Sequence, residues 1–291
     1  GNSNLNPLSF PVVHADKHFF AFHPLQAGTF FDCNDGGIYK TTNAGATWTD
    51  LSNGLQISQM YRIGVSQTAT NNVFCGLQDN GSRQLFGSQW YSVTGGDGME
   101  SIIDYTNNNN QYTSYSNGVL YRTLDLWTTL TTISDNFPGG QPEGAWVTPF
   151  VMDPVNPSIL YAGYDKVYKT TNQGNSWTAI SPVLATDLLR SIAVAPSNAN
   201  VIYAASYDTL YKTTNGGSTW TLMPLPLALG SLGLAVTYIA VNPTNPQQLF
   251  FTVSGYSSVN KVYKSDNGGQ TSINYAGTLP NVSVNCITYQ N

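Results

Sequence analysis

The sequence is short of charged side chains and of long apolar runs, and each shortage removes a class of protein. Only 9% of the 291 residues carry a charge, against roughly 25% in an ordinary soluble domain. No apolar run approaches the ~18–20 residues that span a bilayer, so membrane insertion is not predicted. The net charge of −5 and the scarcity of arginine exclude the basic surface that nucleic-acid binding needs.

Cysteine is also scarce, and its pattern excludes two further kinds of site. Cys33, Cys75 and Cys286 are the three cysteines, an odd set with neither a disulfide framework nor metal-ligand spacing. We expect them to be small buried side chains. The sequence predicts no cofactor.

What the chain does contain is apolar and aromatic. Apolar residues make up 41%, and there are 18 Tyr, 12 Phe and 6 Trp. This supply of core side chains excludes a disordered chain. The remaining positions are rich in Asn, Thr, Ser and Gly, so the sequence predicts a folded β-rich protein.

A turn of the form Tyr-Lys-Thr/Ser-x-Asn-x-Gly-x-Thr/Ser recurs four times. Its shared asparagines are Asn43, Asn172, Asn215 and Asn267, with spacings of 129, 43 and 52 residues. Since 129 is three times 43, two altered repeats are expected between the first pair, and the segments 81–93 and 119–127 fill those places. Each period of about 43 residues holds four short strand-like runs separated by turn residues, which is typical of a β-propeller blade.

The repeat therefore predicts an all-β fold, a β-propeller of four-stranded antiparallel blades. First strands are expected at 19–23, 61–66, 101–105, 147–153, 191–195, 237–242 and 285–289, giving six complete blades plus the first strand of a seventh. After an N-terminal segment 1–13, residues 14–291 form one propeller domain, with blades at about 14–53, 54–95, 96–135, 145–182, 186–225 and 235–279 and a partial blade at 280–291. An unpaired last strand would leave exposed edges. Either the run 8–12 helps to close the ring or the chain is cut from something longer, and we favour the cut.

The residue types of the repeated turn indicate a structural role. Asn and Thr or Ser side chains bond the amides of their own turn, Gly adopts positive φ, and Trp packs back on the blade. These residues therefore predict a turn that stabilises the hairpin between the third and fourth strands, rather than a binding site. The residues assigned to it are Asn43, Gly45, Trp48, Asn172, Gly174, Trp177, Asn215, Gly217, Trp220, Asn267 and Gly269.

The repeated turn resembles the Asp-box, or BNR repeat, of sialidases, two-propeller xyloglucan-hydrolysing glycosidases and sortilin-type receptors. The segments 14–18, 34–37, 76–81, 95–98 and 145–149 resemble a family of large secreted bacterial proteins. These carry tandem sortilin-like or xyloglucanase-like propellers and often end in a type IX secretion sorting domain. The resemblance implies an extracellular or cell-surface location and a second propeller or further domains in the same precursor.

Polar residues gather in the loops that lead into first strands and join second to third strands, the usual ligand face of a propeller. Glycoside hydrolysis needs two carboxylates across a groove, and the candidates are Asp16, Asp79 and Asp97. These aspartates equally suit turns, where Asp bonds backbone amides. Candidate ligand-binding residues are His14, His18, Arg62, Asp35, Gln78, Asn80, Glu100, Trp146, Tyr164 and Tyr207.

Two narrower interpretations of these residues are not favoured. His14, Asp16 and His18 offer imidazole and carboxylate ligands at alternate positions, but no metal site is predicted. The run from Tyr61 to Gly64 is similar to the sialidase Tyr-Arg-Ile-Pro signature with Gly in place of Pro. The arginine triad that grips a sialidase substrate's carboxylate is not evident.

Three classes of function stay open. The favoured one is a secreted ligand-binding module for a glycan or a protein, with a ring of tyrosines (Tyr115, Tyr164, Tyr207 and Tyr256) around one face. The second is half of a two-propeller xyloglucanase-like glycoside hydrolase. The third is a structural or assembly protein of the cell surface.

Overall fold

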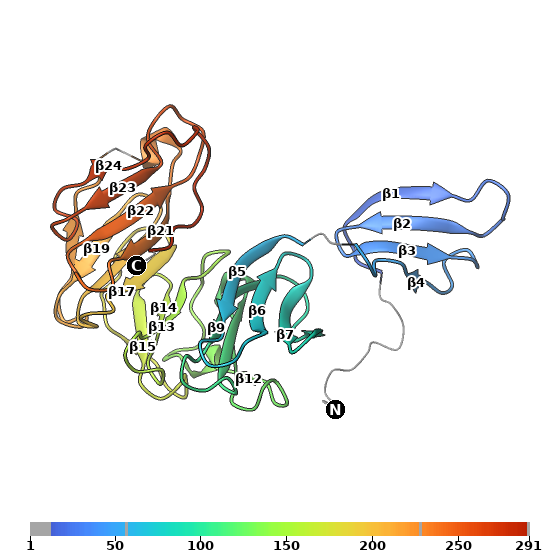
Figure 1. Cartoon of the computed structure of the whole chain (residues 1–291), viewed down its shortest axis with the longest axis horizontal. Coiled ribbons are helices and arrows are strands. Elements are labelled where there is room, and N and C mark those ends of the chain that lie inside the picture. The colour runs from blue at the N-terminus through green and yellow to red at the C-terminus, as the bar shows by residue number, and fades with distance from the viewer. Residues whose placement is uncertain (1–12, 56–57, 227–228, 290–291) are drawn as a thin grey trace.

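The computed structural model describes residues 13–55, 58–226 and 229–289. Within these ranges the chain is all-β, with 24 strands in six four-stranded antiparallel sheets and three short 3-10 helices. Each sheet is built from four strands that follow one another in the chain, and Figure 1 shows the sheets succeeding each other from the blue to the red end. This is the arrangement of β-propeller blades that the repeat predicts. No helix of the described residues is long and apolar enough to cross a membrane.

The first three sheets, called blades 1 to 3, share the order first to fourth strand. Blade 1 comprises β1 (Lys17–Phe22), β2 (Phe30–Asn34), β3 (Gly37–Thr41) and β4 (Thr49–Asp50). Blade 2 comprises β5 (Met60–Val65), β6 (Asn72–Leu77), β7 (Gly81–Phe86) and β8 (Gln89–Ser92). Blade 3 comprises β9 (Gly98–Ile103), β10 (Gln111–Tyr115), β11 (Leu120–Thr123) and β12 (Thr131–Thr132), with η1 (Ser116–Gly118) between β10 and β11.

The next three sheets, blades 4 to 6, repeat this order. Blade 4 follows η2 (Ser134–Asn136) and comprises β13 (Phe150–Met152), β14 (Leu160–Gly163), β15 (Val167–Thr170) and β16 (Thr178–Ala179). Blade 5 comprises β17 (Ser191–Val194), β18 (Ile202–Ala205), β19 (Leu210–Thr213) and β20 (Thr221–Met223). Blade 6 follows η3 (Gly230–Leu232) and comprises β21 (Val236–Val241), β22 (Leu249–Val253), β23 (Val262–Ser265) and β24 (Ile273–Asn274).

The repeated turn joins the third and fourth strands, and its own side chains satisfy its amides. In blade 1 the hydroxyl of Thr41 accepts hydrogen bonds from the amides of Asn43 (3.3 Å) and Gly45 (2.9 Å). The Asn43 side-chain oxygen accepts the Thr47 amide at 2.8 Å. The same bonds recur from Thr170, Thr213 and Ser265. Side chains therefore hold this turn together from within, as its residue types predict.

Blade 3 keeps the same turn with altered residues. Thr123 accepts the amides of Asp125 and Trp127, and Asp125 accepts the amide of Thr129 at 2.8 Å. A carboxylate oxygen thus replaces the amide oxygen of asparagine at the same position. The altered repeat expected here is present, although its glycine is missing.

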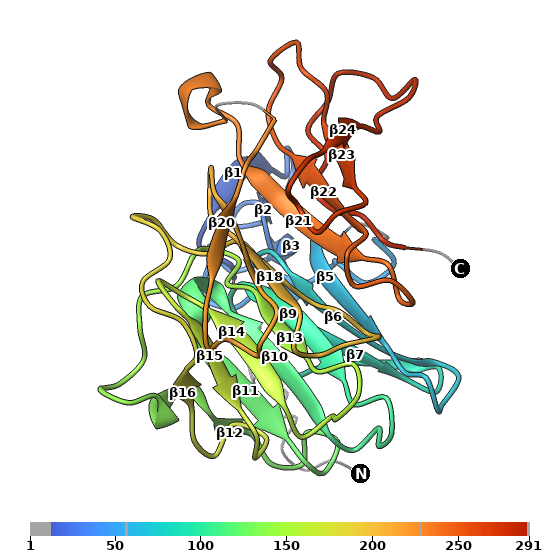
Figure 2. The same cartoon turned by 90° about the vertical axis from the view of Figure 1, so that its left-hand side faces the viewer.

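Neighbouring blades pack through apolar faces and through the repeated turn. The first strands β5, β9, β13, β17 and β21 each contact the next one, a succession that Figure 2 shows from the side. The indole N–H of Trp177 donates to the carbonyl of Ile133 (3.0 Å), and that of Trp220 to the carbonyl of Ile180 (2.8 Å). Each acceptor lies just after the fourth strand of the preceding blade. Trp177 and Trp220 thus lie at the interfaces between blades, a contact that the predicted packing of each tryptophan on its own blade did not include.

The segment after blade 6 begins a seventh blade. No strand is assigned at the predicted 285–289, but the segment runs beside β21. Thr237, in β21, donates to the carbonyl of Val284, and Asn242, just past its end, donates to the hydroxyl of Tyr289. The ring of Tyr289 also packs against Phe250 at 5.9 Å. The chain therefore forms six blades and part of a seventh.

Blade 1 is set apart from the others. Figure 1 shows its sheet at one end of an open arc, away from blade 2. Phe19, Phe20 and Phe22 of β1 are exposed, whereas blades 3, 5 and 6 bury at least half of each first strand. The apolar residues of β1 are typical of a buried first strand, but in this structure they are exposed to solvent.

Two expectations need qualification. The prediction of buried cysteines is confirmed for Cys75 and wrong for Cys286, which is exposed, while Cys33 is half-buried. The exposed thiol lies in the partial seventh blade, where no strand of the described residues covers it. The run 8–12, considered for closing the ring, lies outside the described residues.

Candidate functional site

The loops into first strands and between second and third strands place most of the predicted residues on one surface, called here the loop face. Two groups of side chains form on it. An acidic group lies where blades 1 and 2 meet, and a second group surrounds the inner ends of β5 and β9.

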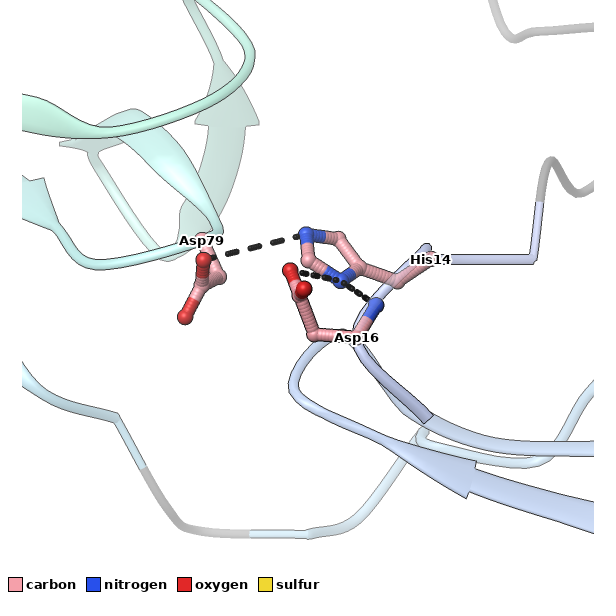
Figure 3. Close-up of side chains that lie close together, drawn as sticks. All are labelled: His14, Asp16 and Asp79. Carbon is pink, nitrogen blue, oxygen red and sulfur yellow. Dashed lines mark hydrogen bonds and ion pairs between the residues drawn. The ribbon is translucent and has the colours of Figure 1, made fainter. Parts of the chain in front are cut away.

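His14 is the centre of the acidic group, as Figure 3 shows. It precedes β1, and its Nδ1 lies 3.6 Å from a carboxylate oxygen of Asp16. Its Nε2 lies 3.9 Å from Asp79, in the turn between β6 and β7. The structure thus joins the predicted residues His14, Asp16 and Asp79 across two blades.

Asp79 has an unusual electrostatic setting. Burial raises the pKa of its carboxyl group, and the negative charges of Asp97 and Asp35 raise it further, while His14 opposes the shift. Asp97 accepts the amide of Asp79 at 3.0 Å. Asp97 therefore caps a turn, as the structural interpretation of these aspartates expects. The raised pKa means that Asp79 holds its proton more tightly than an ordinary aspartate does.

The remaining predicted residues of blade 1 pair with each other or with blade 2. His18 forms an ion pair with Asp35. The side-chain amide of Asn80 donates weakly to the carbonyl of Asp35, at 3.4 Å, and to that of Gln78. His18 does not join His14, so the pair of histidines considered from the sequence is not brought together.

A divalent cation would find three ligands in the acidic group. One ligand atom each from His14, Asp16 and Asp79 lies within 4.8 Å of the others. One imidazole and two carboxylates form a donor set that transition metals accept. Because Asp79 comes from a different blade, its spacing in the sequence gives no sign of this grouping.

The second group is a chain of hydrogen bonds from blade 4 to blade 2. The indole N–H of Trp146 donates to the hydroxyl of Tyr61 at 2.9 Å, and that hydroxyl donates to the side-chain oxygen of Gln78. The Trp146 ring remains 46% exposed. Two of these three residues are predicted ligand-binding residues, and Tyr61 was not selected for binding.

Arg62 and Glu100 form the base of this group. The guanidinium Nε donates to the Glu100 carboxylate at 2.9 Å, and the guanidinium lies over the ring of Tyr238 from blade 6, 5.4 Å from its centroid. Burial raises the pKa of Glu100, and the charge of Arg62 partly offsets the shift. Both residues are thus engaged with each other. Tyr238 was not among the predicted site residues. The one sequence signal for it is its position in the predicted first strand 237–242.

The predicted tyrosine ring is not uniform. Tyr164 is fully buried and donates its hydroxyl to the carbonyl of Gly118 at 2.6 Å, so its face is not open to a ligand. It lies in a cluster of rings with Phe137 and Tyr168. Tyr207 stays partly exposed under the guanidinium of Arg190, and Tyr256 is exposed. Tyrosines at the same position of the repeat therefore differ in how far their side chains are exposed to solvent.

The described surface also has two shallow hollows away from both groups. One of about 250 Å³ lies beside Lys261 and Asn281, and one of about 340 Å³ beside Asp187 and Asp208. The Lys261 ammonium group donates to Asn281 and to two backbone carbonyls, which indicates a structural role. Neither hollow is lined by a predicted site residue, so the hollows of the surface and the two groups of polar residues lie at different places.

No family model matches the sequence. Among curated proteins, a xyloglucanase of Hypocrea jecorina is 30% identical over 87 residues, which are 28% of this chain and 10% of that protein. Among solved structures, an ancestral GH74 enzyme matches with a TM-score of 0.56 and 17% identity, over 86% of this chain and 36% of its own. The GH74 xyloglucanase of Xanthomonas campestris matches with a TM-score of 0.54 and 18% identity, over 86% and 45%.

A further propeller, YCF48 bound to D1 peptide, matches with a TM-score of 0.53 and 11% identity, over 93% of this chain and 86% of its own. At these identities the structural likenesses support the β-propeller fold. The chain spans about a tenth of the curated xyloglucanase and less than half of each GH74 structure.

Proposed function

We propose that this propeller is a secreted ligand-binding module that holds a glycan or an extracellular protein segment on its loop face. The observation that carries the proposal is the exposed indole of Trp146, fixed by a hydrogen bond to Tyr61 of another blade. A rigid aromatic ring beside polar groups is what stacking on a sugar or a peptide side chain requires.

The loop that carries Trp146 is itself braced. Its carbonyl accepts the amide of Asn117 at 3.4 Å, and Thr148 donates to the carbonyl of Ala145 at 2.8 Å. Ligand binding would therefore order few additional groups, which favours affinity. Gln78, which accepts a hydrogen bond from the hydroxyl of Tyr61, adds a polar group to this arrangement.

The comparisons support both ligand classes without choosing between them. Two of the matched proteins are named xyloglucanases, and one YCF48 structure has D1 peptide bound. The segments 14–18, 34–37, 76–81, 95–98 and 145–149 resemble a family of large secreted bacterial proteins. This resemblance supports an extracellular location, a sortilin-like or xyloglucanase-like family and a type IX sorting tail.

Xyloglucan oligosaccharides, a broad glycan array and a peptide library are the ligands to test. Titration of the best ligand against Trp146→Ala should show affinity at least tenfold weaker, with little change in melting temperature. Trp90, 54% exposed on β8 and outside the loop face, supplies the matched control, since Trp90→Ala should bind normally. Absence of any ligand above background, or equal losses in both variants, refutes the proposal.

A hydrolase is the second candidate, and Asp79 favours it. Its carboxyl group has a raised pKa, accepts none of the backbone hydrogen bonds seen at the described turns, and lies near the carboxylate of Asp16. Retaining glycosidases place two carboxyl groups roughly 5–5.5 Å apart. Release of reducing sugar from xyloglucan that disappears in Asp79→Asn and in Asp16→Asn would establish this activity. Release that persists in both variants excludes these residues.

A further inference from the structure

Three of the exposed apolar residues of blade 2 lie on the face that points toward blade 1. Phe74 of β6 packs on Ile103 and Trp127 of blade 3, so the opposite face of blade 2 is the one turned to its predecessor. That face carries Ile63 and Val65 of β5, and Trp90 is placed on it by pairing opposite Leu85. All three are exposed.

Blade 1 has a matching apolar face. In blade 4 the face of Tyr161 and Val167 packs on Ile192 and Ile202 of blade 5. From the register of the strands, the equivalent face of blade 1 is formed by Phe19, Ala21 and Phe31. Phe19 is exposed, and Ala21 and Phe31 are half-buried. Two surfaces that are buried between later blades are therefore both open between blades 1 and 2.

We infer that blade 1 has a second, docked position, in which the face of Phe19 and Ala21 covers the face of Ile63 and Val65. The occupant is blade 1 itself, because every later pair of complete blades in this chain packs in this way. Burial of apolar surface at roughly 25 cal/mol per Å² drives the docking.

The later interfaces also give the register of the docked state. In blades 5 and 6 the amide of Ile239 donates to the hydroxyl of Ser191 at 3.1 Å. By repeat position these residues correspond to Ile63 and Phe19. In the same pair of blades, Ala193 packs against the apolar cluster that contains Ile239, and Ala193 corresponds by repeat position to Ala21. Both relations place residues 19–21 beside Ile63.

The connections between the two blades permit this movement. The contacts that now join them are at the loop face, where His14 meets Asp79 and Asn80 meets the carbonyl of Asp35. The strands β4 and β5 are linked by residues 51–59, and connections at least as long, residues 180–190 and 224–235, join the packed blades 4 and 5 and the packed blades 5 and 6. Blade 1 therefore closes by turning about its loop end, and the acidic group stays at the pivot.

Cysteine pairs test the docked position in the full chain. Oxidation of Ala21→Cys/Ile63→Cys should give an intramolecular 21–63 disulfide, identified by peptide mass spectrometry apart from the native thiols. Leu25→Cys/Ile63→Cys is the control, because Leu25 lies at the far end of blade 1, and it should give none. Equal crosslinking of both pairs, or none in either, overturns the inference.

Thiol labelling gives a second measurement that does not depend on disulfide geometry. Ile63 is 60% and Leu222 57% exposed in this structure, so Ile63→Cys and Leu222→Cys should be labelled equally if blade 1 stays open. Docking should slow labelling at position 63 at least tenfold, while Phe19→Ser/Ile63→Cys restores the faster rate. Equal rates at 63 and 222 in the otherwise native chain overturn the inference.

Discussion

Blades 1 and 4 contain the same repeated turn but differ in how they are packed. Asn43 and Asn172 each accept the amide four residues later, at 2.8 and 3.0 Å. Trp177 is buried against Ile133 of the preceding blade, whereas Trp48 packs on Phe30 of its own blade. The turn is thus a local structure, and its tryptophan becomes part of a core only when another blade supplies the opposite wall.

The difference separates two contributions to stability in one chain. Hydrogen bonds within the turn are present in both blades and depend on nearby residues alone. Apolar burial is present in blade 4 and largely missing from blade 1. Substitutions in blade 1 and in the packed later blades therefore measure how much packing between blades adds to the local hydrogen bonds.

The largest contrast is expected between two phenylalanines. Phe251 in β22 is 1% exposed and Phe22 in β1 is 75% exposed. Phe251→Ala should lower the free energy of unfolding by about 3–5 kcal/mol, and Phe22→Ala by less than about 0.5 kcal/mol. Chemical denaturation measures both values. Losses of similar size would show that β1 is buried in solution.

The glycine of the repeated turn should reveal the contact between blades. Gly45 and Gly174 share positive φ, 91° and 88°, so alanine strains both by about 1 kcal/mol. A methyl on Gly174 would also lie 2.7 Å from Ile133, whereas Gly45 has nothing nearer than 3.8 Å. Gly174→Ala should therefore cost about 1–3 kcal/mol more than Gly45→Ala. Equal losses in thermal unfolding would contradict the packing of blade 4 on blade 3.

The asparagine of the turn should show no contrast between the blades. Asn43→Ala and Asn172→Ala each remove the same side-chain bonds, and each should cost about 1 kcal/mol. Their unfolding free energies, measured side by side, should agree within about 0.5 kcal/mol. A much larger loss at Asn172 would mean that this bond depends on the neighbouring blade.

The smallest effect concerns charge where blades 1 and 2 meet. Since the pKa of Asp79 is raised in the folded chain, the folded state holds this proton more tightly, and the ionised carboxylate destabilises it at neutral pH. Asp79→Asn should raise the melting temperature at pH 7, and asparagine tolerates the φ of 59° found there. The gain should fade as the pH falls through the raised pKa toward the ordinary value of 3.8. A gain that is independent of pH would refute the electrostatic cause.

Much of the fold could be predicted because each repeat is recognised from residues that lie close together in the sequence. The turn at Asn172, the strands beside it and the number of blades depend on neighbouring residues and on a regular period. The site was predicted less well. Trp146 and Tyr61 are 85 positions apart and Arg62 and Glu100 are 38 apart, and no local pattern connects such pairs. Tyr164 was misjudged because burial by Phe137 is not visible from its place in the repeat.

The sequence by itself determined the strands, the stapled turns and the residue types on the loop face, since these follow from bonds between residues a few positions apart. The tertiary structure decided which loop residues touch, which tyrosine is buried and which tryptophan is covered by another blade. Those outcomes depend on how whole blades pack, and apolar burial has no preferred direction or spacing in the chain. Blade 1 shows the distinction most clearly, because its turn is complete while its apolar faces still lack the neighbouring blades that cover both faces of blades 3 to 5.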